Sequence, residues 1–370
     1  MKVWKTLPDR RGGVAVLVAV CLVVLLSFAA LVVDIGYGLV VKNQLHNVAD
    51  SAALAGARRL GRVYCPELDP VNPCIPYAQQ QSYVLTSADR AAIVAEVQDI
   101  ASKNTAGGVS ISVNAADIRI GDWDIPTRTL TVTDTRPTAV EVTARRDGVA
   151  NGPITTFLGN IMGVNSISVR STSVRSGQPE EPTAALTGVG VVGPGELDIP
   201  VALSQSRFTG GEGGFCGDLI RFSPPTDPDA CGGWTLLTTE NASDREIRDL
   251  LGDILADPSV TPPLNVGDPI TVSNGVLSNP TFQAMETLYN ARKDAAGVWK
   301  AFVPIYDGNM CNPGPGDNLH VRGFATVLIT QVLGPPDKLI EGTILCDVVE
   351  PARGGGADFG TLGSIPGLVR

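Results

Sequence analysis

The chain has 370 residues, 44% of them hydrophobic and 18% charged, so it can form about two globular domains with cores of their own and is not a disordered chain. Its 41 glycines and 27 prolines indicate many turns but lack the three-residue period of collagen. The formal net charge of −10 argues against a nucleic-acid partner, because a phosphate backbone repels an acidic surface.

The first predicted element is an apolar segment that runs from Val14 to Val33 without a charged residue. Such a segment forms a helix long enough to cross about 30 Å of hydrocarbon, and we predict one transmembrane helix. A cleaved secretory signal is the alternative, but its apolar region is shorter and its cleavage site lies closer. Basic residues precede the span, so the positive-inside rule places the N-terminus in the cytoplasm and the bulk of the chain outside it.

The apolar pattern of residues 34–60 continues the helix out of the membrane, giving one helix of about 47 residues and about 70 Å. Small residues recur there at three- or four-residue steps and allow another backbone to approach closely. Either the chain's own globular domain or another subunit could pack on this face. The small residues are Ala49, Ala52, Ala53, Gly56 and Ala57.

Six cysteines follow the span, and an even number outside the cytoplasm predicts disulfides. Their spacing suggests the local pairs Cys65–Cys74, Cys216–Cys231 and Cys311–Cys346, although six cysteines allow fifteen connectivities. Cys21 lies inside the span, where it serves as a small apolar residue. No CxxC or HxxxH spacing accompanies the cysteines, so we expect no metal site.

The region after the long helix is predicted to be α+β. Residues 61–177 form an α/β domain with a helix capped by Ser87, several strands, a short helix over 153–162 and a closing strand at 166–169. A polar linker follows at 178–182. Residues 183–350 form a β-rich domain with two helices, one capped by Ser243 and one by Asn279, and residues 351–370 form a flexible tail.

Motifs for chemistry are mostly missing from the sequence. No phosphate loop, GxSxG elbow or HExxH helix occurs, and the GxGxxG at 188–193 is followed by proline where a dinucleotide site needs a helix. Asp122 and Asp124 flank Trp123 in a pattern compatible with a carbohydrate-stacking site, but a β-turn with a buried tryptophan explains it more simply. We therefore predict no catalytic residue, no cofactor and no small-molecule substrate.

Residues 10–60 resemble the N-terminal module of the Flp pilus-assembly TadE/TadG-like proteins, in which a membrane helix, an Asp-x-Gly junction and an alanine-rich helix follow one another. The matching positions are Gly12, Asp34, Gly36, Gln44, Asp50 and 52–57, with weaker likeness at 121–123, 139–144 and 157–159. The resemblance implies a bacterial envelope protein of an adhesive pilus system without enzymatic activity. With the small residues it gives the expected helix-packing set Asp34, Gly36, Ala49, Asp50, Ala52, Ala53, Gly56 and Ala57.

One departure from prepilin-type substrates narrows the functional expectation. Val18 stands at the fifth position after Gly13, where most processed substrates carry glutamate, so a full-length anchored minor component is favoured over a processed major pilin. We expect a structural or assembly component anchored in the bacterial inner membrane, with other pilus-assembly or pilin-like subunits as partners. A membrane-tethered binding protein or adhesin independent of a pilus is the alternative, and an envelope enzyme is a third.

Overall fold

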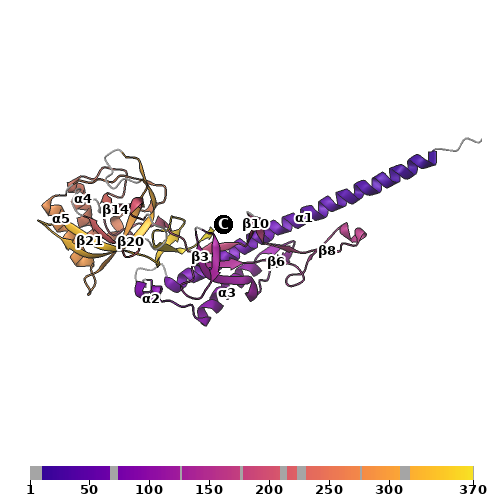
Figure 1. The fold of residues 1–370 in the computed structure, drawn as a ribbon, viewed down its shortest axis with the longest axis horizontal. Helices are drawn as coiled ribbons and strands as arrows, with labels where there is room; N and C mark the ends of the chain where they lie inside the picture. Colours follow the sequence, from indigo (N-terminus) through magenta and orange to yellow (C-terminus); the bar gives the residue numbers. More distant parts are fainter. Residues whose placement is uncertain are drawn as a thin grey trace, which may run out of the picture.

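The computed structural model describes residues 11–66, 74–125, 127–175, 178–208, 215–222, 231–275, 277–308 and 317–369. The long apolar helix α1 (Arg11–Tyr64) stands first, and a β-rich region with further helices follows it, in keeping with the α+β prediction (Figure 1). Helix α1 is continuous over 54 residues and ends four residues later than predicted. Its side chains are mostly exposed before Asp34 and regularly buried on one face from Asp34 onward.

The described strands nearest to α1 form a five-stranded antiparallel sheet, called the proximal sheet below. Ile120 and Val140 lie opposite each other in neighbouring strands and face α1 and α3 (Ser87–Ser102), whereas Arg119 and Glu141 occupy the alternate positions. This follows from the two-residue period of a strand. The strands, in spatial order, are β24 (Gly367–Val369), β12 (Thr183–Ala185), β5 (Ala139–Val142), β3 (Ile118–Asp124) and β4 (Thr129–Val132).

Short elements complete the region around α1. Helix α3 is capped one residue earlier than predicted, because the Thr86 hydroxyl accepts the Asp89 N–H and Asp89 bonds back to Thr86 in a capping box. The others are α2 (Tyr77–Gln81), the 3-10 turn η1 (Ala115–Asp117), and the antiparallel pairs β1 (Thr105–Ala106) with β2 (Val109–Ser110), β6 (Arg145–Arg146) with β9 (Val169–Arg170), β7 (Ile154–Thr155) with β8 (Ser166–Ile167), and β10 (Ser173–Arg175) with β11 (Gln178–Glu180).

The helix predicted over 153–162 is wrong. The chain forms strand β7 and then a tight loop that contains only the 3-10 turn η2 (Gly159–Met162). Gly163 ends this turn at a positive φ of 80°, and the N–H groups of residues 157–159 bond to Asp34 of α1. A tertiary acceptor has therefore replaced the carbonyls that a helix would have used.

A second, larger sheet of seven described strands, called the distal sheet, packs against α4 (Asp244–Ala256) and α5 (Asn279–Arg292). Ser243 caps α4 as predicted, in a capping box with Glu246, and the cap of α5 is Ser278, one residue before the predicted Asn279. In order, its strands are β15 (Leu219–Phe222), β21 (Leu339–Leu345), β20 (Leu319–Leu333), β19 (Trp299–Tyr306), β14 (Val201–Ser204) and β16 (Gly232–Trp234), with β18 (Pro269–Ile270) paired to β20; the 3-10 turns are η3 (Gln205–Phe208) and η4 (Pro258–Val260).

A third sheet connects the other two and changes the predicted boundaries. Its described strands are β17 (Leu264–Asn265), β13 (Val189–Val192), β22 (Val348–Gly354) and β23 (Thr361–Ile365). The tail predicted to be flexible instead forms the end of β22, β23 and β24, and β24 pairs with β12. Strand β12, predicted to open the second domain, belongs to the proximal sheet. These strands find hydrogen-bond partners far away in sequence, so their local composition did not reveal them.

Candidate functional site

The small-residue face of α1 lies at the centre of the region around the proximal sheet. Ala49, Ala52, Ala53 and Ala57 are completely buried. A Cβ added at Gly56 would lie 2.6 Å from Val97 Cγ2 of α3 and 3.0 Å from Val140 Cγ1 of β5. The chain's own α3 and β5 therefore pack on this face. The sequence allowed either the chain's own domain or another subunit here, and in the structure the chain's own domain packs on it.

Asp34 makes a joint between α1 and the loop that follows β7. Its side chain is only 5% exposed, and its two oxygens accept the N–H groups of Phe157 at 2.7 Å, Leu158 at 3.2 Å and Gly159 at 2.7 Å. Burial by itself raises the pKa of Asp34, but the three backbone donors outweigh it and hold the pKa below its ordinary value. The charged carboxylate is thus the form that holds the loop. At Gly36, which belongs to the expected helix-packing set, an added Cβ would meet no atom within 4 Å.

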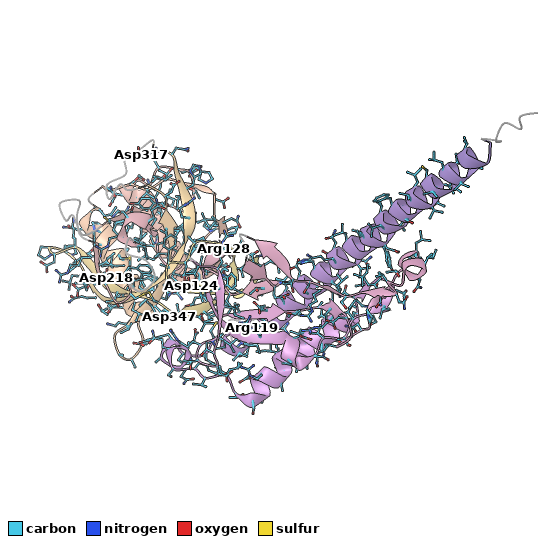
Figure 2. All side chains as sticks on the ribbon, turned by 45° about the vertical axis from the view of Figure 1, so that its right-hand side comes forward. Arg119, Asp124, Arg128, Asp218, Asp317 and Asp347 are labelled. Carbon is cyan, nitrogen blue, oxygen red and sulfur yellow. A yellow bond between two sulfur atoms is a disulfide. The ribbon has the colours of Figure 1, made fainter. Side chains whose placement is uncertain are left out.

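The polar side of α1 borders a cavity of about 570 Å³. Asn43, His46, Asn47 and Asp50 of α1 line it, opposite Arg119, Trp123, Arg128 and Glu141 and the segment 180–183. Figure 2 labels Arg119 and Arg128 in the part of the molecule between α1 and the distal sheet. The cavity thus combines charged groups of both signs with an aromatic ring.

An ion pair forms part of the cavity wall. Arg119 Nη1 donates to Glu141 Oε1 at 2.5 Å, and Glu141 is buried. Burial raises the pKa of Glu141, and the Arg119 guanidinium offsets only part of this rise. A buried carboxylate beside an aromatic ring can orient a neutral polar ligand through hydrogen bonds.

Trp123 does not lie in the β-turn that its sequence suggested. It is a half-buried residue of β3 and lines the cavity, while the flanking Asp122 and Asp124 are absent from the described lining. Asp122 accepts the Thr138 hydroxyl, and Asp124 accepts the Thr127 N–H. The alternation of a strand separates the ring from the two carboxylates, so the three residues do not form one site.

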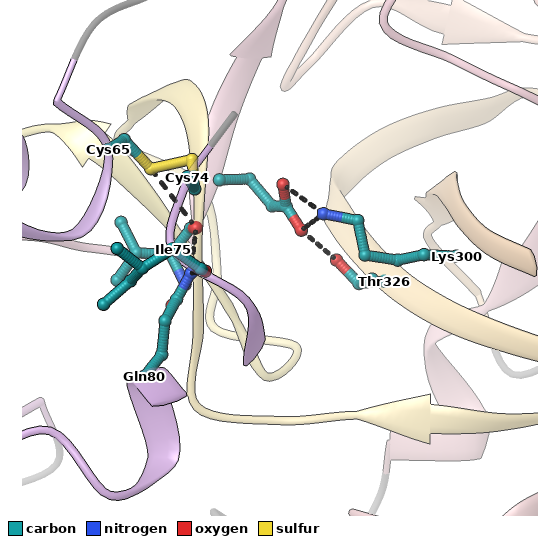
Figure 3. Close-up of a disulfide and its surroundings, with 8 residues drawn as sticks. Cys65, Cys74, Ile75, Gln80, Lys300 and Thr326 are labelled. Atoms are coloured by element: carbon teal, nitrogen blue, oxygen red, sulfur yellow. Dashed lines mark hydrogen bonds and ion pairs between the residues drawn. A yellow bond between two sulfur atoms is a disulfide. The ribbon is translucent and has the colours of Figure 1, made fainter. Parts of the chain in front are cut away.

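Near the C-terminal end of α1, helix α2 contacts strand β22 of the third sheet beside a disulfide (Figure 3). The disulfide Cys65–Cys74 forms as predicted. The buried Gln80 donates to the Val349 carbonyl at 3.1 Å and accepts the Val349 N–H at 2.7 Å, so one side chain satisfies both backbone groups of that residue. Gln80 and its role gave no recognisable signal in the sequence.

Glu350, the residue after Val349 in β22, binds to the distal sheet. Lys300 Nζ of β19 donates to both carboxylate oxygens of Glu350 at 2.7 and 3.0 Å, and Thr326 of β20 lies 3.5 Å from the same carboxylate (Figure 3). Adjacent residues of β22 therefore bond in opposite directions, Val349 to α2 and Glu350 to the distal sheet. Helix α1 also approaches β23 closely, since a Cβ at Gly61 would lie 2.0 Å from the Ser364 oxygen. Through these contacts the third sheet joins the proximal and distal sheets.

The disulfide pattern of the distal region corrects the sequence prediction. Cys216 pairs with Cys346, so the predicted pairs Cys216–Cys231 and Cys311–Cys346 are both wrong. Strand β15 pairs with β21 and brings residues 130 positions apart into contact. Cys231 is also disulfide-bonded, and Cys311 lies outside the described residues.

The remaining sequence candidates have structural roles. The glycine-rich 188–193 segment contains β13, and a Cβ at Gly188 would lie 2.1 Å from the Ala357 oxygen, so the glycine permits close approach of two backbone segments. Within the described ranges, no group of three or more His, Cys, Asp and Glu side chains is arranged to hold a metal ion. Cys21, within the apolar segment of α1, is free and exposed.

Helix α1 therefore defines the class of protein, a β-rich chain built on a helix whose exposed apolar half is long enough and apolar enough to cross a membrane. Residues 12–59, almost all of α1, match the family described as "Putative Flp pilus-assembly TadE/G-like", which confirms the resemblance found in the sequence. The chain thus carries a TadE/G-like module. Searches of curated proteins and of solved structures gave no match.

Proposed function

We propose that the chain is a membrane-anchored structural or assembly component, minor pilin-like, of a Tad/Flp-type adhesive pilus. The observation that carries the proposal is the coincidence of the family match at residues 12–59 with α1. The first half of the matched helix is an exposed apolar rod, and the second half is the centre of a folded core. An anchoring helix that is also the core of its own extracytoplasmic body is suited to holding that body at the membrane.

The proposed topology is a single pass through the bacterial inner membrane, with the N-terminus in the cytoplasm and the bulk of the chain periplasmic or extracellular. The positive-inside rule supports this orientation, since Lys2, Lys5, Arg10 and Arg11 precede the apolar segment. Disulfides favour an oxidising compartment for the residues that follow.

The proposed mechanism is rigid presentation of the distal sheet, without a chemical step. A continuous helix buried against α3 and β5 couples the orientation of the membrane segment to that of the proximal sheet. The Cys65–Cys74 junction and the contacts of Val349 and Glu350 then carry this orientation to the distal sheet. The expected partners are other pilus-assembly or pilin-like subunits, and neither a nucleic acid nor a small-molecule substrate is expected.

Deletion of the gene in the bacterium that produces the chain tests the proposal. We expect loss or marked reduction of surface filaments in electron micrographs and of attachment in a surface assay, with both restored by the wild-type chain. The matched control supplies the same chain with residues 1–33 replaced by a cleavable secretion signal, which should not restore filaments. Normal filaments and normal attachment after deletion would contradict the proposed function.

The cavity beside α1 favours a second candidate, a membrane-tethered binding protein or adhesin that acts without a pilus. An aromatic ring next to hydrogen-bonding carboxylates and amides is an arrangement that suits a sugar ring. The change Trp123→Ala separates the two candidates. If the chain is a binding protein without a pilus, Trp123→Ala lowers attachment while filament number stays normal. If the chain is a pilus component, attachment changes only together with filament number.

A further inference from the structure

The loop between β7 and β8 presents an exposed apolar tip. Phe157 is 64% exposed, Leu158 38%, Ile161 83% and Val164 54%. These four residues, called the apolar tip below, lie within a 22-residue segment, 148–169, that contains no charged residue. Loops that face water are normally rich in polar side chains, and an exposed apolar group of this kind marks an interaction surface.

The tip lies at the place where the apolar segment of α1 ends. Asp34 directly follows Val33, the last residue of the uncharged span, and its carboxylate holds the N–H groups of residues 157–159. Each helical residue advances only about 1.5 Å along the axis, so the loop is attached at the outer boundary of a span that begins at Val14. Figure 1 shows the β8 hairpin reaching along α1 toward its N-terminal end, beyond the rest of the β-rich region.

An aromatic pair stands at the same level. The rings of Tyr37, one turn after Asp34, and Phe157 contact edge to face with centroids 5.4 Å apart. Tyrosine is enriched where a membrane helix passes through the headgroup region, because its ring is apolar and its hydroxyl is polar. This pair therefore fits a lipid interface better than bulk water.

Several N–H groups of the loop are already hydrogen-bonded, which lowers the cost of moving the loop into an apolar environment. The N–H of Thr156 bonds to the Asn165 carbonyl at 3.2 Å, and the N–H of Val164 bonds to the Gly159 carbonyl at 2.9 Å. The N–H of Ile161 bonds to the Leu158 carbonyl at 3.0 Å, and Asp34 accepts the N–H groups of residues 157–159. The apolar side chains can thus enter lipid without carrying these N–H groups in unsatisfied.

We propose that the apolar tip docks into the lipid interface on the outer face of the membrane that α1 crosses, as a second point of attachment. The occupant is a lipid bilayer, because the chain itself fixes the tip at the depth where hydrocarbon gives way to headgroups. Two attachment points joined through Asp34 would fix the tilt and rotation of the proximal sheet relative to the membrane. The inference rests on the proposed anchoring of α1.

The test places spin labels on the full-length chain in discs of phosphatidylcholine and phosphatidylglycerol. Ile161→Cys and, separately, Val164→Cys carry the label in a Cys21→Ala background. Cys21 in the wild-type chain reports on the span, and Val260→Cys reports on an exposed apolar residue of the distal region. The accessibility of each label to oxygen, which concentrates in lipid, is compared with that to a water-soluble nickel chelate.

We expect the oxygen-to-nickel ratio at residues 161 and 164 to rise well above that at 260 and to approach that at 21. Ratios at 161 and 164 equal to that at 260, with Cys21 in lipid, would overturn the docking proposal and leave the anchoring intact. Labels shielded from both reagents would also overturn it, because protein would then cover the tip. A water-exposed Cys21 would refute the anchoring itself and the docking with it.

Discussion

The substitution Gly56→Leu tests most directly whether the small-residue face of α1 serves the chain's own fold. The first carbon of any side chain at this position would lie 2.6 Å from Val97 Cγ2, and Val97 is β-branched and fully buried. Overpacking of this kind costs about 1–3 kcal/mol, and leucine adds three further carbons to a filled site. We therefore expect Gly56→Leu to lower the free energy of unfolding by about 3 kcal/mol.

The matched substitutions Gly56→Ala and Gly38→Ala separate crowding from helix propensity. Replacing glycine by alanine inside a helix is worth about 1 kcal/mol, which offsets part of the crowding at Gly56 and leaves a net loss of about 0–2 kcal/mol. A Cβ at Gly38 would meet no atom within 4 Å, so Gly38→Ala should be neutral or gain up to about 1 kcal/mol.

The assay is urea unfolding of the full-length proteins in detergent micelles, followed by tryptophan fluorescence. A loss of about 3 kcal/mol corresponds to a midpoint lower by about 1 M or more, since such slopes are about 1–3 kcal/mol per molar urea. A wild-type midpoint for Gly56→Leu would refute the packing argument. Loss of filaments at unchanged stability would show instead that another subunit uses the face.

The remaining predictions concern topology, disulfides and pH. Protease added to spheroplasts should degrade the chain beyond α1, and protection of the bulk would contradict the proposed orientation. Mass mapping without reductant should find the disulfides Cys65–Cys74 and Cys216–Cys346, and free thiols at these positions would refute the pairing. By loop entropy, removing Cys216–Cys346, which closes the longer loop, lowers the free energy of unfolding by about 5 kcal/mol, and removing Cys65–Cys74 lowers it by about 3 kcal/mol. The pKa of Asp34 is lowered by its three N–H donors against the opposing effect of burial, so the loop contact is fully formed above the ordinary value of 3.8 and is lost as the pH falls through the folded pKa. A spin label at residue 161 should become more mobile only in that acidic range, and mobility independent of pH there would contradict the joint.

Local sequence determined the parts of this protein whose interactions are close in the chain. The uncharged segment from Val14 to Val33 forms a helix because each backbone hydrogen bond in a helix joins residues four positions apart. The continuation of this helix after Val33 followed from the helical spacing of its apolar residues. The helix cap at Ser243 and the disulfide Cys65–Cys74 are likewise local and were predicted correctly. The family match rests on this part of the chain, where local pattern is most informative.

Only the tertiary structure decided which distant segments meet. Cys216 reaches Cys346 because β15 pairs with β21, and β24 returns to β12 across almost two hundred residues, neither of which composition could show. Residues 157–159 form no α-helix because Asp34, more than 120 positions earlier, accepts their N–H groups. Trp123 borders a cavity for a similar reason, since the lining comes from α1 and from several strands. A hydrogen bond or a disulfide depends on positions in space, and for these residues positions in space are fixed by how the sheets assemble around α1.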